Sequence, residues 1–187
     1  MRPWLLALKG LPGVGKSTLA GELAHALGWP LLDHDDLKDA LATAGASVPG
    51  SATYELLFRL AGRQLRIGVS VLCDSPLVSP GLYALARRKA LEAGGRLAVV
   101  ECRLADEAEH RRRVEAREGL LRSDGRTTTW AHLVAYRDRH RITRAYAIDA
   151  PHLLLDSGRP LPEQVAETMH WLQAGPTRAG PVARPAL

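Results

Sequence analysis

The sequence contains no asparagine, a single phenylalanine and only two cysteines, and none of its apolar runs is long. A helix that crosses a membrane needs about 20 consecutive, mostly apolar residues, so we expect no membrane span. Two cysteines do not make a disulfide framework, and we expect Cys73 and Cys102 to be reduced thiols in the core. The absence of asparagine also excludes the Asn-Lys-x-Asp motif with which G-proteins recognise guanine.

The overall composition is that of a globular domain. The 187 residues are 46% hydrophobic and 24% charged, which is enough to bury a core and too apolar for a disordered chain. The apolar stretch at the start of the chain ends at Lys9, and it is shorter than the apolar segment of about 7–15 residues in a signal peptide. We therefore expect a cytoplasmic protein of one domain.

The formal net charge of +5 suggests nucleic-acid binding as one hypothesis. Basic residues concentrate between Arg103 and Arg144, but acidic residues are interleaved with them at Asp106, Glu107, Glu109, Glu115 and Glu118. A mixture of both signs on one helix is typical of a solvated face and not of a DNA-binding stripe. We therefore favour a protein that binds phosphate groups with arginine, and we keep nucleic-acid binding as the alternative.

Short apolar runs alternate with amphipathic helical patterns along the chain. We expect strands at Trp4–Leu8, Leu31–Asp33, Val69–Cys73, Leu97–Glu101 and His152–Leu155. We expect helices at Ser17–Leu27, Asp35–Leu41, Tyr54–Ile67, Pro80–Glu92, Asp106–Glu118, Trp130–Tyr146 and Pro162–Leu172. This alternation predicts a three-layer α/β domain with a parallel sheet. The domain should occupy residues 1–174, with a lid at about 113–130, and the tail at 175–187 should be disordered.

A glycine-rich segment follows the first predicted strand and matches the pattern G-x-x-x-x-G-K-[ST]. It consists of Gly10, Leu11, Pro12, Gly13, Val14, Gly15, Lys16 and Ser17, and Thr18 continues it into the next helix. Its glycines let successive backbone N–H groups point into one anion-binding concavity, to which the helix N-terminus adds partial positive charge. We expect this loop to bind ATP, with Lys16 on the β- and γ-phosphates and the Ser17 hydroxyl on Mg²⁺.

A second informative segment is the acidic turn after the second predicted strand, which contains Asp33, Asp35 and Asp36. A carboxylate there can accept the proton of an attacking hydroxyl, and Asp35 is our candidate for this general base. We expect Lys38, one turn later, to bind the acceptor as an anion clamp, and Asp33 to contribute to the same site. The alternative is that Asp33 or Asp35 only caps the next helix. We expect His34 to be an exposed turn residue.

These motifs, together with Val71–Leu77 and Glu109–Arg117, resemble the small AAA-labelled P-loop phosphotransferases. That group is similar to polynucleotide 5′-hydroxyl kinases, zeta-type toxins, chloramphenicol phosphotransferase and gluconate kinase. The resemblance covers roughly residues 4–172, and it implies a kinase-type parallel sheet of order 2-3-1-4-5 with a short helical lid. Where the family usually has arginine after its acidic turn, this chain has Lys38, which replaces a bidentate phosphate fork by a point charge.

The same resemblance assigns roles to three further residues. It puts Asp74 at the end of the strand beside the P-loop strand, so we expect Asp74 to hold Mg²⁺ through water or to orient Ser17. The alternative for Asp74 is that it is an N-cap in the turn before Ser79. Arg113 and Arg117 share one helix face. Lid arginines in similar kinases stack on adenine or neutralise the γ-phosphate, so we expect Arg113 to bind nucleotide and Arg117 to act in catalysis. The backbone of residues 156–158 should lie near the adenine.

The sequence thus predicts an ATP- and Mg²⁺-dependent kinase that phosphorylates a hydroxyl of a small molecule. Two alternatives stay open. One is a polynucleotide or RNA-end 5′-hydroxyl kinase, which the basic charge favours, and the other is a nucleotide-binding regulatory or toxin-like module.

Overall fold

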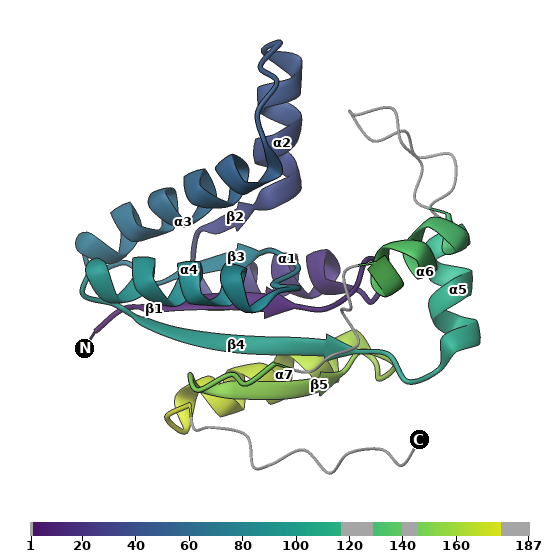
Figure 1. Cartoon of the computed structure of the whole chain (residues 1–187). Coiled ribbons are helices and arrows are strands. Elements are labelled where there is room, and N and C mark those ends of the chain that lie inside the picture. Colours follow the sequence, from purple (N-terminus) through teal and green to yellow (C-terminus); the bar gives the residue numbers. More distant parts are fainter. Residues whose placement is uncertain (1, 117–128, 140–145, 177–187) are drawn as a thin grey trace.

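The computed structural model describes residues 2–116, 129–139 and 146–176 of the chain. Its strands are β1 (Trp4–Lys9), β2 (Leu31–Asp33), β3 (Val71–Asp74), β4 (Arg96–Arg103) and β5 (His152–Asp156). Its helices are α1 (Lys16–Leu27), α2 (His34–Thr43), α3 (Gly50–Arg66), α4 (Pro80–Glu92), α5 (Glu107–Glu115), α6 (Trp130–Arg139) and α7 (Leu161–Gln173). The five strands form one sheet with helices on both of its faces (Figure 1).

The sheet has the order β2-β3-β1-β4-β5, and each of its strand pairs is parallel. The central strand β1 pairs on one side with β3, where Leu5 is opposite Val71, and on the other side with β4, where Leu5 is opposite Leu97. This arrangement confirms the predicted three-layer α/β fold and the strand order that the family resemblance implies. Because all the strands run the same way, their carboxyl ends meet at one edge of the sheet.

Each face of the sheet is covered by a separate apolar layer. Helices α3 and α4 cover the face to which Leu5, Ala7 and Val99 point, and their core residues include Leu57, Phe58, Ala61, Leu65, Tyr83, Ala86 and Ala90. Helices α1 and α7 cover the opposite face, with Leu6, Leu8, Leu19, Ala20, Leu23, Leu72, Val100 and Leu155 in its core. Alternate side chains of β1 therefore belong to the two different layers, which explains why the sequence of this strand is one continuous apolar run.

Three helices lie beyond the carboxyl edge of the sheet. Helix α2 projects away from the strand ends on the side of α3, and α5 with α6 lies on the other side (Figure 1). At the same edge, the P-loop residues connect β1 to α1, strand β3 beside β1 ends at Asp74, and β2 ends at Asp33. The fold therefore gathers the P-loop and both acidic segments at one edge, where ligands bind in open α/β sheets.

Several local expectations are corrected by the packing. Helix α3 begins at Gly50 and not at Tyr54, so the preceding loop is shorter than predicted. The helix that begins at Trp130 does not reach Tyr146, because the Tyr146 hydroxyl donates a hydrogen bond to the Leu77 carbonyl and its ring packs against the α3–α4 core. His34 is buried instead of exposed.

The two cysteines have the state that the sequence predicts. Cys73 and Cys102 are buried free thiols on strands that β1 separates. Burial raises the pKa of the Cys102 thiol to about 12, and it raises the pKa of Cys73 as well, so both thiols are unreactive. In the part of the chain that the structure describes, none of the helices combines the length and the apolar character that a membrane crossing requires.

Candidate active site

The P-loop has the curled backbone that its glycines predict. Gly13 and Gly15 have φ angles of 85° and 97°, in the left-handed region that side chains with a Cβ avoid. A Cβ added at Gly10 would lie 2.7 Å from the Cys102 carbonyl oxygen, so only glycine fits there. Gly15 is the N-cap of α1, and the Lys16 ammonium donates a 3.0 Å hydrogen bond to the Leu11 carbonyl. The loop thus forms a cradle of backbone N–H groups at a helix N-terminus, which is an anion-binding geometry.

Helix α5 packs directly against this cradle. A Cβ at Gly13 would lie 2.6 Å from Cγ2 of Val114, so the loop and the helix are in close contact. His110 is buried, and its Nε2 lies 2.8 Å from the Pro12 carbonyl oxygen. Because a carbonyl only accepts, Nε2 carries the hydrogen of this bond. Trp130 contacts the His110 ring edge-on, with ring centroids 5.3 Å apart. His110 therefore connects the P-loop to both α5 and α6.

We expect His110→Ala to weaken ATP binding roughly five- to tenfold, because a hydrogen bond of this kind contributes about 1 kcal/mol and here it restrains the loop that holds the phosphates. His110→Gln, whose amide can still donate to the carbonyl, should recover part of the affinity. Isothermal titration calorimetry measures both, and His170→Ala on the exposed end of α7 is the control. Equal affinities for His110→Ala and wild type would show that the contact does not shape the loop.

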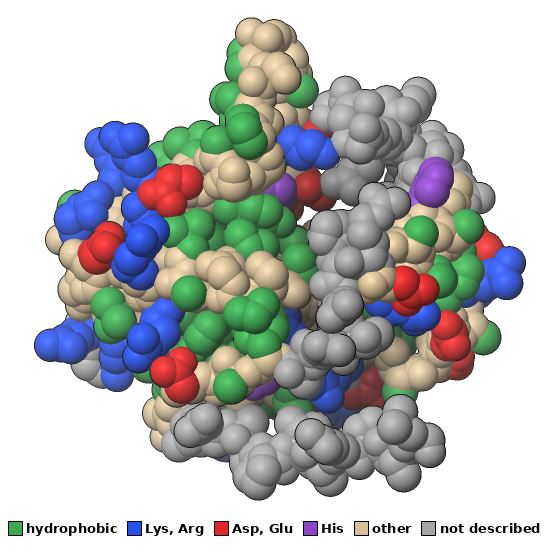
Figure 2. Space-filling model, viewed as in Figure 1, with side chains coloured by type: hydrophobic (Ala, Val, Ile, Leu, Met, Phe, Trp, Pro, Cys, Tyr) green, Lys and Arg blue, Asp and Glu red, His purple; other side chains and the backbone are tan. Residues whose placement is uncertain are grey.

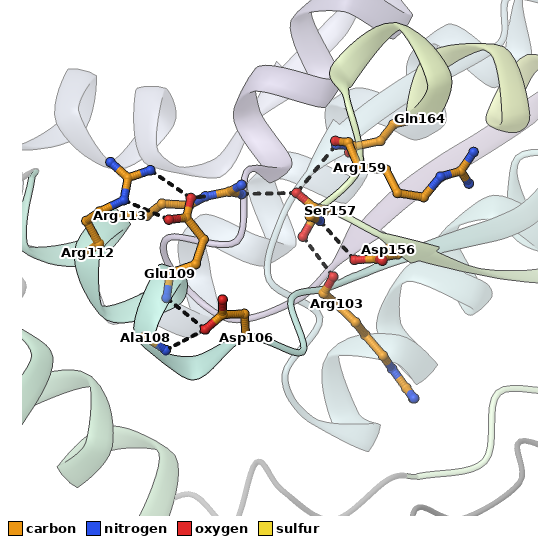
Figure 3. A network of polar contacts seen from close by, with 11 residues as sticks. Arg103, Asp106, Ala108, Glu109, Arg112, Arg113, Asp156, Ser157, Arg159 and Gln164 are labelled. Carbon is orange, nitrogen blue, oxygen red and sulfur yellow. Dashed lines mark hydrogen bonds and ion pairs between the residues drawn. The ribbon is translucent and has the colours of Figure 1, made fainter.

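Arg113 lies between the P-loop and the turn after β5 (Figure 3). Its guanidinium donates to Glu109 Oε1 at 2.7 Å and to the Ser157 carbonyl at 3.1 Å. A Cβ at Gly15 would lie 3.7 Å from Arg113 Nη1, which places the guanidinium next to the loop. Hydrogen bonds from Arg112 and Arg113 lower the pKa of the Glu109 carboxyl to about 2, so Glu109 is ionised. Arg113 and the backbone of the turn after β5 are thus neighbours. Arg117 lies outside the described residues.

The acidic turn after β2 has a different role for each carboxylate. Asp33 is the N-cap of α2, and its Oδ1 accepts a 2.7 Å hydrogen bond from the Asp35 backbone N–H. Asp33 is also paired in register with Asp74 on β3. Burial, in combination with the nearby Asp74 charge, raises the pKa of Asp33 despite this hydrogen bond. The capping alternative is therefore correct for Asp33, although its second oxygen is not used by the cap.

Asp35 follows in the first turn of α2, and its side chain is 58% exposed. One of its carboxylate oxygens, Oδ1, lies 3.5 Å from Nδ1 of His34. The buried His34 ring stacks on Tyr54 of α3, with ring centroids 3.9 Å apart, and its Nε2 lies 2.8 Å from the Thr53 hydroxyl. Lys38, one turn further along α2, is half-buried. The sequence-predicted acceptor residues are thus on one short helix, which His34 attaches to α3.

The residues present fit an Mg²⁺ ion that is shared with nucleotide phosphates. Such an ion takes one or two carboxylates and keeps several waters, so it needs no cage of protein ligands. Asp74 is 4% exposed at the end of β3, while Ser17 is exposed in the first turn of α1. The N-cap of α4 is Ser79, so the capping alternative for Asp74 is wrong. The buried Ser75 Oγ has no hydrogen-bond partner within the described residues, and a water of the ion's hydration shell would give it one.

A group of charged residues next to the P-loop has no counterpart in the sequence predictions. Glu101, at the end of β4, accepts from Lys9 at 2.8 Å, from His152 at 3.1 Å and from Arg103 at 2.9 Å. Lys9 and Glu101 also line a cavity of about 400 Å³ together with Gly10, Pro76 and Tyr146. Burial alone would raise the pKa of Glu101, but the hydrogen bonds and charges of His152, Lys9 and Arg103 hold it well below its ordinary range. The pattern that could have revealed this group is a charged pair at the ends of two adjacent buried strands.

We expect the ion pairs of Glu101 to make the free energy of unfolding depend on pH. The folded-state pKa of Glu101 is below the value of about 4.3 of an unfolded chain, so the carboxylate stabilises the fold above that pH and its contribution is lost as the pH falls further. Glu101→Gln should therefore be less stable than wild type at pH 7, and the difference should shrink toward pH 3. Urea unfolding at a series of pH values measures it. A difference that is constant with pH would contradict the assignment.

The fold and the P-loop define a class of protein, the P-loop phosphotransferases with a kinase-type parallel sheet. Residues 5–142 match the family model described as an AAA domain, which is most of the chain, and the chain belongs to this family. The resemblance that the motifs suggested is thereby confirmed.

The fold is shared with solved structures of kinases. A putative kinase from Chloroflexus aurantiacus J-10-fl matches with a TM-score of 0.73 and 22% identity, covering 93% of this chain and 98% of that chain. The APS kinase of Mycobacterium tuberculosis, solved in complex with AMPPNP and APS, matches with a TM-score of 0.66 and 24% identity, covering 92% and 98%. A curated cytidylate kinase from Pseudomonas paraeruginosa (strain DSM 24068 / PA7) is 38% identical over 71 residues, which is 38% of this chain and only 31% of that protein.

Proposed function

We propose that the protein is an ATP- and Mg²⁺-dependent kinase that transfers the γ-phosphate to a hydroxyl of a small molecule. The observation that carries this proposal is the order of the sheet, which puts β3 beside the P-loop strand β1 and β2 beside β3. The phosphate cradle, the buried carboxylate Asp74 and the acidic turn with Asp33 and Asp35 therefore follow one another along one edge. Phosphoryl transfer needs a nucleotide site, a metal-binding carboxylate and an acceptor site close to one another, and this order supports that arrangement.

Each residue has a distinct part in this proposal. Lys16 and the backbone of the P-loop hold the phosphates, and Ser17 and Asp74 hold Mg²⁺, which would neutralise charge on the transferring group. Asp35 accepts the proton of the attacking hydroxyl. The second oxygen of Asp33 and the Lys38 ammonium orient the acceptor, and Arg113 binds the nucleotide. We assign Arg117 to the γ-phosphate on the family resemblance alone.

The distribution of charge supports a small-molecule acceptor over a nucleic acid. On α5, Arg111 pairs with Glu115, and Arg112 and Arg113 both pair with Glu109. On the opposite side of the molecule, Lys89 pairs with Glu55, and the space-filling view shows acidic groups among the basic ones over α3 and α4 (Figure 2). Among the described residues of α3, α4 and α5, these acidic neighbours interrupt the positive surface that a phosphate backbone would follow.

The test is a screen for ADP release with ATP and Mg²⁺ against hydroxyl compounds, in parallel with labelling of 5′-hydroxyl RNA and DNA. We expect ADP release with a small-molecule acceptor and no transfer to either oligonucleotide. A nucleic-acid kinase would label these ends, and its affinity would fall with salt with a slope of about −0.7 per contacted phosphate. ATP binding without transfer to any acceptor would instead favour a regulatory module.

A further inference from the structure

His34 lies between the proposed base and helix α3. Its ring is almost completely buried, whereas the adjoining Asp35 side chain is exposed. The ring stacks on Tyr54 with an interplanar angle of 14°, which restrains the plane of the imidazole. Its two nitrogens therefore face two different groups, Thr53 on α3 and Asp35 on α2.

The Thr53 hydroxyl determines which ring nitrogen carries the hydrogen. Thr53 Oγ1 lies 2.7 Å from the Gly50 carbonyl oxygen and 2.8 Å from His34 Nε2. A carbonyl only accepts, so the single hydroxyl hydrogen points to Gly50, and Thr53 accepts from His34. The hydrogen of the neutral ring is thus on Nε2, and Nδ1 has its lone pair toward Asp35 Oδ1.

Nδ1 and Oδ1 are then two acceptors 3.5 Å apart, and a hydrogen bond between them requires an added proton. We propose that His34 is the positioning residue of Asp35, and that it receives at Nδ1 the proton that Asp35 removes from the acceptor hydroxyl. This inference rests on the proposed role of Asp35 as the base. It adds to that role a place for the proton once the carboxylate has taken it.

The step balances in atoms and charge. The O–H bond of the acceptor breaks and its proton passes to the Asp35–His34 pair, while the acceptor oxygen bonds to the γ-phosphorus. The bond from the γ-phosphorus to the bridging oxygen breaks, and ADP leaves with that electron pair. The resulting carboxylate–imidazolium pair releases its proton to water. A ring that is already protonated cannot accept this proton, so acid should slow the transfer.

Other ionisable groups lie on the elements that hold the ring, and one of them provides a control. Tyr54 stacks on it from α3, and Asp33 and Asp36 flank the pair in sequence. Asp74 of β3 is paired with Asp33 in register, and Lys38 lies one turn along α2. Asp36 is the best matched control, because it is an exposed carboxylate in the same helical turn as Asp35.

The first experiment needs no turnover. The ¹⁵N–¹H spectra of the His34 ring in the whole protein should show the Nε2–H tautomer near neutral pH. Asp35→Asn should change the ¹⁵N chemical shift of Nδ1 in these spectra, because Asp35 Oδ1 lies 3.5 Å from it, and Asp36→Asn should change this shift less. An Nδ1–H tautomer in the wild type, or an equal effect of Asp36→Asn, overturns the inference.

The second experiment uses His34→Gln, whose amide still donates to Thr53 but has no group toward Asp35 that accepts a proton. Basal ATP hydrolysis, with water as acceptor, should be about tenfold slower with an unchanged KM for ATP. The acid limb of the pH–rate profile of this variant should move to lower pH, because the variant has no imidazole at this position that acid can protonate. An unmoved limb overturns the inference. An effect of Asp35→Asn on the ring spectra without any phosphoryl transfer would contradict the proposed function alone. Phosphoryl transfer without such an effect on the spectra would contradict this inference alone.

Discussion

Lys16→Ala is expected to remove most of the thermal stabilisation that ATP and Mg²⁺ give the protein. A ligand that binds only the folded state stabilises it by RT ln(1 + [L]/Kd), about 2.7 kcal/mol at a concentration of 100 Kd. Lys16 begins α1 at the cradle, where its ammonium already contacts the loop backbone and where it would reach the β- and γ-phosphates. The Tm of the variant, measured by scanning fluorimetry, should hardly respond to the ATP concentration that raises the Tm of the wild type.

Lys38→Ala is the matched control for this prediction, because it removes the same charge from α2 and not from the P-loop. Its ATP-induced rise in Tm should equal that of the wild type. A full rise in Lys16→Ala, or a larger rise with GTP than with ATP in the wild type, would contradict the assignment of the loop to ATP.

Asp35→Asn is expected to lower the rate of phosphoryl transfer by about 10²–10⁴-fold, because it removes the proposed general base and keeps the size of the side chain. The ATP-induced rise in Tm should stay as in the wild type, since Asp35 is on α2 and the nucleotide contacts are on the P-loop. Single-turnover measurement of ADP formation with the acceptor from the screen separates this rate from binding.

Two neighbouring carboxylates make this prediction selective. Asp36→Asn should leave the rate nearly unchanged. Asp33→Asn is also informative, because asparagine caps a helix about as well as aspartate, so the variant keeps the N-cap of α2 and loses only charge. A greater loss of rate in Asp33→Asn than in Asp35→Asn would move the base to Asp33, which is the carboxylate paired with Asp74 in the sheet.

The layers and the P-loop could be predicted from sequence because each depends on local pattern. The strand–loop–helix context of Gly10–Ser17 predicts both the cradle and its place at the sheet edge. Ser79 followed by Pro80 likewise predicts the start of α4, where Ser79 Oγ accepts from the Leu82 N–H. The order of the strands came from the family resemblance, since alternation of strands and helices by itself leaves several orders open.

The contacts of three histidines could not be predicted, because each depends on residues far away in the sequence. His110 meets Pro12 at a separation of 98 residues, and His152 meets Glu101 at a separation of 51. His34 is buried because α3 begins early enough to bring Thr53 and Tyr54 against it. A helix start that is placed late, at Tyr54, leaves His34 without these neighbours and makes it look like an ordinary turn residue.

The projection of α2 has a consequence for how such proteins diversify. Helix α2 packs chiefly against β2 and α3, whereas the cradle is supported by α1 and by residues of α5. Sequence drift in residues 34–49 can therefore reshape the surface around the proposed acceptor site, whereas α3 carries core residues such as Leu57 and Phe58 and is constrained by the sheet. We expect that exchange of the segment 34–49 between homologous chains would transfer the acceptor preference, so the segment is suited to the construction of chimeric proteins.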